Sequence, residues 1–333
     1  MARGLQARLL PVSLSPHAVS HNMEAYSLYL QGQYFARRAS DADVERGITS
    51  VRQAIALEPE FALAHAELAS AYMYVGTFGT GTAGILDRAR DEVNQALRLD
   101  PTLRSARNVR GNLAIIAWDW AAAKTQLDEL IASGSGDAEA LFRRGQLARA
   151  FGHTDEALIY FLKGLQLDPT RVLYHVQLAM LLNVMRRPAE ARSAAEDAIS
   201  INPTATKAYL LIALLELDAG HIDAASAAVE RESGEYYRLE GRAIVALAKH
   251  RSADSEAAHS QLIEKYHATS AIQIAQVYAY RGERAKAFEW LERAFDQQDP
   301  GIVNVMTAPL FASLHGDPRF NAVLRKLNLT ETL

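Results

Sequence analysis

Residues 136–169 read GDAEALFRRGQLARAFGHTDEALIYFLKGLQLDP, two proline-free stretches of mixed apolar and polar residues that end at Pro169. Proline cannot continue a helix, because it has no N–H to donate and its ring clashes with the preceding turn. Gly145 and Ala157 are small enough to let two helices approach closely, and Phe161 is large enough to fill the space between neighbouring units. The segment therefore predicts two antiparallel helices followed by a turn into another unit.

The same arrangement recurs along the chain in steps of 34 residues. A fixed period of about 20 to 50 residues is typical of repeat proteins, in which each unit buries its apolar face against its neighbours. Four positions of the unit keep the step: Ala89, Ala123, Ala157, Ala191 and Ala225; Val93, Leu127, Phe161, Ala195 and Val229; Gly111, Gly145, Ala179 and Ala213; Pro101, Ser135, Pro169 and Pro203.

The register divides the chain into helix pairs. We expect units at 25–59, 60–101, 102–135, 136–169, 170–203 and 204–233, a degenerate pair at 234–267 and a further unit at 268–299. All ten prolines fall at proposed turns, helix starts or terminal segments, which supports an all-α chain. The predicted fold is a right-handed superhelical solenoid of about 7–8 antiparallel helix pairs. The predicted organisation is an N-terminal extension (1–24), a repeat domain (25–299) and a tail (300–333) with a capping helix near 318–327.

This period and residue pattern resemble the tetratricopeptide repeat. Three segments extend the resemblance: NMEAYSLYLQGQYFARR (22–38), AWDWAAAKTQL (117–127) and AFEWLERAFDQQDPGIVNVMTAPLFASLHGDPRFNAVLRKLNL (287–329). They resemble the C-terminal repeat region behind TolB-like segments in bacterial nucleotide cyclases and winged-helix transcriptional regulators. The resemblance implies a free-standing relative or a regulatory part of a larger signalling protein. It also implies a periplasmic location as the alternative to a cytoplasmic one.

Composition and motifs argue against several classes of function. The formal net charge is -4, with 35 basic and 39 acidic residues, and a nucleic-acid partner usually requires a basic excess. The chain has no cysteine, which removes disulfides and thiolate catalysis. It contains neither HExxH nor G-x-S-x-G. Pro11 interrupts the early apolar stretch, so we expect no secretory signal and no membrane insertion. We therefore predict a cytoplasmic, non-catalytic protein without metal or cofactor.

Two features leave alternatives open. Gly79, Gly81 and Gly84 form a G-x-G-x-x-G pattern, but a helix precedes it where a dinucleotide site needs a strand, so we interpret 76–84 as an inter-helix insertion. Trp118 and Trp120 flank a turn, where aromatic residues usually pack between helices. The alternative is a small-ligand sensor with a pocket formed by these tryptophans and the insertion.

The predicted binding surface is the concave face, which the first helix of each unit lines. It would hold a peptide or protein partner with an acidic portion and an apolar anchor, although solvated helix faces explain the same residues. Glu139 and Leu173 stand where a chaperone-tail clamp needs lysine, so we expect no such ligand. If exposed, Leu210 and Leu214 offer a patch for self-association. The predicted groove residues are Asn108, Asn112, Arg143, Gln146, Arg149, Val176, Met180, Asn183, Leu210, Leu214 and Asp218.

Overall fold

The computed structural model describes residues 20–78, 84–133 and 137–330, and over these ranges the regular elements are all helical. Two are short 3-10 helices, η1 (Pro300–Asn304) and η2 (Pro309–Leu314). The α-helices are α1 (Met23–Ala36), α2 (Asp41–Leu57), α3 (Ala62–Phe78), α4 (Ile85–Leu99), α5 (Arg104–Ile116), α6 (Trp120–Ala132), α7 (Ala138–Ala150), α8 (Thr154–Leu167), α9 (Val172–Val184), α10 (Pro188–Ile201), α11 (Ala208–Asp218), α12 (Ile222–Arg231), α13 (Glu235–Ala248), α14 (Ser252–Tyr266), α15 (Ala271–Tyr280), α16 (Arg284–Asp296) and α17 (Pro318–Lys326).

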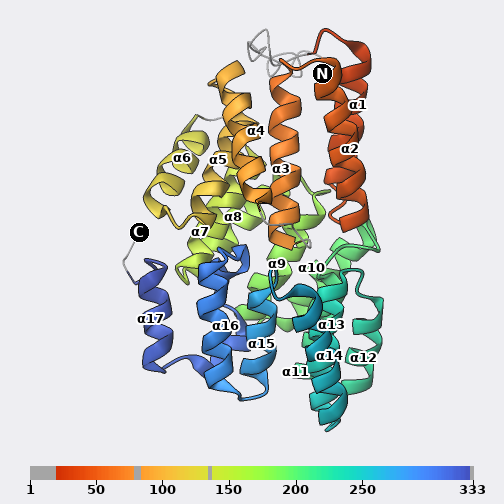
Figure 1. The fold of residues 1–333 in the computed structure, drawn as a ribbon, viewed down its shortest axis with the longest axis vertical. Coiled ribbons are helices and arrows are strands. Elements are labelled where there is room, and N and C mark those ends of the chain that lie inside the picture. Colours follow the sequence, from red (N-terminus) through yellow and green to blue (C-terminus); the bar gives the residue numbers. More distant parts are fainter. Residues whose placement is uncertain (1–19, 79–83, 134–136, 331–333) are drawn as a thin grey trace, which may run out of the picture.

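The helices pair as the repeat predicts. Each unit expected between residues 25 and 299 holds two consecutive helices, from α1 with α2 to α15 with α16. The helical solenoid is therefore confirmed over the described ranges, whereas the division into extension, repeat domain and tail remains a prediction. The first two pairs lie at one end of the molecule and α12–α14 at the opposite end (Figure 1).

The turn inside each of the four central units has one residue in the left-handed conformation. These residues are again 34 positions apart, with φ of 59° at Trp118, 75° at Gly152, 58° at Arg186 and 82° at Gly220. The conformation turns the next N–H back to the first helix, as in the Schellman motif. In the fourth unit the N–H of His153 donates to the carbonyl of Ala148 at 3.0 Å.

Small residues let the two helices of a unit approach, as predicted. A Cβ atom on Gly145 would lie 2.6 Å from Cδ1 of Phe161, and one on Gly111 would lie 3.0 Å from Cδ2 of Leu127. Real Cβ atoms rarely approach other heavy atoms so closely, and interiors packed this densely do not absorb an added methyl group without movement.

Contacts between distant units close the superhelix on its N-terminal side. Arg37 Nη2 lies 2.9 Å from Asp168 Oδ2, and the N–H of Thr206 donates to the carbonyl of Ala39 at 3.1 Å. The side chain of Asn202 also donates to the carbonyl of Arg38. The first unit thus binds the turns that end the fourth and fifth units.

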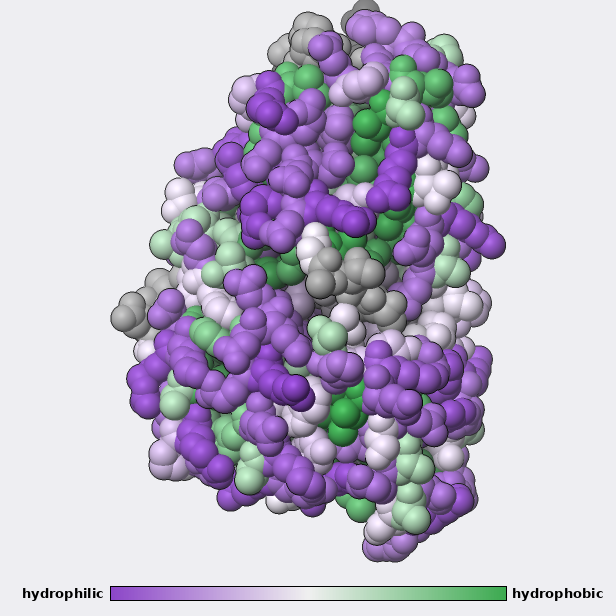
Figure 2. Space-filling model, viewed as in Figure 1, coloured by the Kyte–Doolittle hydropathy of each residue, from purple (hydrophilic) through white to green (hydrophobic). Residues whose placement is uncertain are grey.

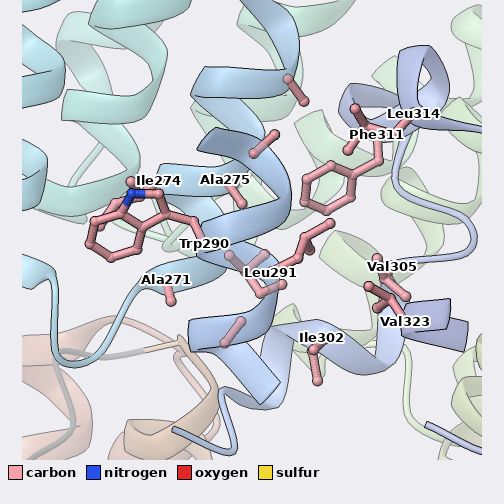
Figure 3. Packing of buried hydrophobic residues seen from close by; sticks show 14 of the residues in the cluster. Ala271, Ile274, Ala275, Trp290, Leu291, Ile302, Val305, Phe311, Leu314 and Val323 are labelled. Carbon is pink, nitrogen blue, oxygen red and sulfur yellow. The ribbon is translucent and has the colours of Figure 1, made fainter. Parts of the chain in front are cut away.

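The C-terminal tail closes the other side. It forms the expected short helix α17, but its contacts extend beyond the last repeat. Nε1 of Trp120 donates to the carbonyl of Leu327 at 2.7 Å, and nearby the indole of Trp118 stacks on Phe295 of α16, in the last repeat, at 4.6 Å between ring centroids. Figure 3 shows Phe311 of η2 beside α15 and near Leu291, inside the largest apolar cluster. The interpretation of both indoles as packing residues is therefore confirmed.

A candidate binding site in the central cavity

Most of the predicted groove residues meet at one cavity. Asn112 of α5, Arg143, Gln146 and Arg149 of α7, Met180 and Asn183 of α9, and Leu210 and Leu214 of α11 line a hollow of about 110 Å³. These helices are the first members of successive units. The 34-residue register therefore placed the side chains on a common inner surface.

Three predicted groove residues do not line this cavity. Val176 is buried in an apolar cluster, and Asn108 donates from Nδ2 to Asp137 Oδ2 at 2.8 Å. Asp218 is exposed and lies 4.0 Å from Arg186. Val176 and Asn108 face the packing side of their helices. The stripe of each helix that faces the cavity is narrow, and it includes fewer residues than were predicted to lie on it.

The expectation of an open, solvent-exposed groove is wrong. The tail enters the superhelix, and η1 contacts α3, α5 and α7. Many of the groove residues are consequently buried, including Asn112, Arg143, Arg149 and Leu210. Because Leu210 is only 2% exposed, the condition for a self-association patch at Leu210 and Leu214 is not met.

The tail and α13 add residues to the cavity that sequence reasoning missed. Pro300, Val303, Asn304 and Thr307 come from the tail, and Tyr237 and Glu240 come from α13. No local signal marks them, because they reach the cavity through the winding of the superhelix. Gln177 and Lys207 also line the cavity. They were not predicted, although both belong to the regular units.

Arg143 is held by a neighbouring carboxylate. Its Nη2 lies 2.6 Å from Glu139 Oε1, and its Nη1 donates to Gln146 Oε1 at 2.8 Å. Burial raises the pKa of Glu139, but Arg143 and Arg171 outweigh burial and bring that pKa to about 2. The pair is therefore ionised at neutral pH and fixes the side chain of Gln146 at the cavity wall.

A second set of charges lies where α11 meets α13. Burial lowers the pKa of the Lys207 amine, and burial raises the pKa of the Glu240 carboxyl against the attraction of Lys207. Glu232 accepts hydrogen bonds from the backbone N–H groups of Lys207 and Leu210 at 2.9 and 3.1 Å. These contacts cap the N-terminus of α11 and hold Lys207 at the cavity.

The pocket for a small ligand that was expected between the tryptophans and the insertion is not formed by Trp118 and Trp120. A second hollow of about 180 Å³ does lie beside Gly76 and Gly84, but Trp118 and Trp120 are not among the residues that line it. Residues 79–83 of the insertion lie outside the described ranges, and so does most of the G-x-G-x-x-G pattern.

Two histidines on first helices of repeat units, His65 and His175, have structural partners. His65 contacts Glu92 Oε2 at 2.5 Å and the carbonyl of Pro59 at 3.0 Å, and His175 contacts the carbonyl of Pro169 at 2.8 Å. Within the described ranges no group of three or more acidic or histidine side chains is placed to hold a metal ion.

Among the helices of the described ranges, none combines the length and the hydrophobicity needed to span a membrane. The face of the molecule shown in Figure 2 is mainly hydrophilic.

Comparisons with known proteins agree with this architecture. No curated protein matches the chain. Human IFIT1, in a dimer with m7Gppp-AAAA, is 18% identical, and the match covers 76% of this chain and 68% of that chain with a TM-score of 0.57. A chain of the APC/C hetero-tetramer Cut9–Hcn1 is 14% identical, with 92% and 61% covered and a TM-score of 0.55. Such identities show the fold alone.

Residues 109–172 match the tetratricopeptide repeat family. The helix pairs on both sides of that segment have the same two-helix architecture, so the chain has a helical repeat fold of the tetratricopeptide type.

Proposed function

We propose that this protein is a non-catalytic interaction module that binds a segment of a protein partner at the mouth of the central cavity. The observation that carries the proposal is the convergence of α7, α9 and α11 on one hollow. Gln146, Met180 and Asn183 line it and remain half-buried. A protein partner can therefore contact these three side chains, whereas it cannot contact Arg149, which is fully buried.

The architecture supports this class of function. Stacked helix pairs present extended concave surfaces for recognition. The solved structure of similar fold that contains Cut9 and Hcn1 is itself an assembly of different chains. Human IFIT1 is named with the RNA-like ligand m7Gppp-AAAA, so the expectation of no nucleic-acid partner rests only on the net charge of -4 and stays a prediction.

The test compares two matched double variants in a pull-down. The dissociation constant of each variant is then measured with the purified partner. Gln146→Ala/Asn183→Ala alters the mouth, whereas Ile159→Ala/Leu162→Ala alters exposed residues of α8 on the outer surface. We expect the mouth variant to bind about thirtyfold more weakly, since each of the two lost hydrogen bonds contributes about 1 kcal/mol. The outer variant should bind as the wild type does.

Other outcomes would contradict the proposal. Equal capture by the wild type and the mouth variant would show that the partner binds elsewhere. Loss on the α8 variant alone would place the partner on the outer surface. Melting temperatures of all three proteins must agree for the comparison to hold.

A further inference from the structure

Arg149 is a buried cation without a carboxylate partner among the described residues. Its side chain lines the central cavity and the residue is 2% exposed. Nε donates to Asn304 Oδ1 at 3.1 Å, and Nη2 donates to the same oxygen. Burial lowers the pKa of Arg149 to about 10, so the guanidinium remains charged at neutral pH.

An unpaired buried charge is costly, and proteins normally pair it or provide a ligand for it. The other cations at the cavity are compensated. Arg143 is paired with Glu139 at 2.6 Å, and Lys207 interacts electrostatically with Glu240 and Glu232. Arg149 has no such acidic neighbour in the described part of the chain, and burial alone shifts its pKa.

Further polar atoms at the cavity also lack partners. Oε1 of Gln177 and Oε2 of Glu240 are buried without a hydrogen bond, and these residues are 2% and 1% exposed. Both side chains line the same hollow as Arg149. Both atoms are hydrogen-bond acceptors, so they would be satisfied by a donor and do not themselves hold an anionic group, which leaves Arg149 as the group that would bind one.

The remaining wall is apolar and limits the size of that partner. Met180, Leu210, Leu214 and Val303 contribute hydrophobic surface to the lining. A volume of about 110 Å³ corresponds to roughly seven to ten water-sized spheres. The space fits a compact molecule with an apolar body and one anionic group.

We propose that the central cavity binds a small organic monocarboxylate, with its carboxylate on Arg149 and its apolar body against Met180, Leu210 and Leu214. Arginine presents its N–H donors in a planar fork that matches a carboxylate. Asn304 holds this fork in place from the tail. The proposal does not depend on a protein partner at the mouth.

Isothermal titration calorimetry of the full chain with benzoate tests the proposal. Benzoate combines one carboxylate with a compact apolar ring, and benzamide is its neutral counterpart of the same shape. We expect saturable binding of benzoate and at least tenfold weaker binding of benzamide, because a charge-assisted hydrogen bond is lost. The variant Arg149→Met should weaken benzoate binding by at least tenfold, while Ile159→Ala on the outer surface should leave it unchanged.

A second variant keeps the test decisive if Arg149→Met does not fold. Leu214→Trp fills the cavity from its half-buried wall, so it should abolish benzoate binding while the helical spectrum is retained. Benzoate binding that survives in this variant would place the site elsewhere and overturn the proposal. The proposal also fails if benzamide binds as tightly as benzoate, if inorganic phosphate displaces benzoate at equal concentration, or if neither benzoate nor 3-methylbutanoate binds the wild type.

Discussion

Arg186 has a backbone conformation that favours glycine. Its φ is 58°, and the equivalent turns of the neighbouring units have Gly152 and Gly220. The left-handed region costs a residue with a Cβ about 1–2 kcal/mol. Glycine would lose more backbone freedom on folding, which offsets about 0.4–1 kcal/mol of the gain. We therefore expect Arg186→Gly to raise the free energy of unfolding by about 0.5–1 kcal/mol, measured by urea denaturation.

The matched control reverses the change. Gly152→Ala puts a Cβ where φ is 75° and where Met306 Sδ would lie 3.1 Å away, so it should lower the free energy of unfolding. Arg186 is exposed, and its 4.0 Å contact with Asp218 is worth little at the surface. A destabilised Arg186→Gly protein would show that this contact matters more than the backbone conformation.

Trp118 shows why one occupant of this turn could not be explained from the sequence. The 34-residue step predicts that position 118 takes the same turn as 152, 186 and 220. It does not predict why a bulky side chain is tolerated there. The reason is the 4.6 Å stacking on Phe295, which belongs to α16, far away in the sequence. Packing between residues so distant leaves no trace in a local pattern.

At the scale of the element, the helix pair of the fourth unit is set by Gly145 against Phe161. Phe161 is fully buried and stacks on Phe142 at 4.9 Å, so it has little room to move. A Cβ at Gly145 would lie 2.6 Å from its ring. Gly145→Ala gains about 1 kcal/mol of helix propensity but loses about 1–3 kcal/mol by overpacking. We expect a net loss of about 1 kcal/mol in the free energy of unfolding by urea denaturation.

Two further proteins separate packing from propensity. In Gly145→Ala/Phe161→Leu the smaller side chain should relieve the clash, so the two changes should cost less together than the sum of the single changes. Gly111→Ala should be milder than Gly145→Ala, since its added Cβ would lie 3.0 Å from Cδ2 of Leu127, whereas the Cβ at Gly145 would lie 2.6 Å from Phe161. Additive effects in the double variant would contradict packing as the cause.

The helix pairs were predictable because their determinants are local. Proline positions, small residues and the 34-residue step all lie within one unit, and they place every pair from α1 to α16. Burial on the inner face was not predictable to the same degree. Arg149 and Asn112 have the sequence character of exposed helix residues, yet the tail covers them. The sequence thus predicted which residues line the cavity better than it predicted how deeply they are buried.

At the scale of the whole molecule, the small rotation between successive units accumulates and decides which distant segments meet. Each unit could be placed from the sequence, but the rotation could not, because it depends on side-chain packing at every interface. That rotation brings the first unit to Asp168 and Asn202, and it brings the tail to α5 and α7. The cavity exists only because the superhelix closes in this way.

Closure also predicts how the protein unfolds. Open repeat arrays are stabilised by contacts between neighbours and can unfold in parts, whereas here the first unit also binds the fifth. Asn202 is 1% exposed, and its side chain bonds to Thr204 and to the carbonyl of Arg38. We expect Asn202→Ala to lower the free energy of unfolding by about 1–3 kcal/mol. Circular dichroism and tryptophan fluorescence should give coincident urea transitions in both proteins. Since the tryptophans lie at 118, 120 and 290, a separate early loss of helicity without a fluorescence change would show that the first unit unfolds alone.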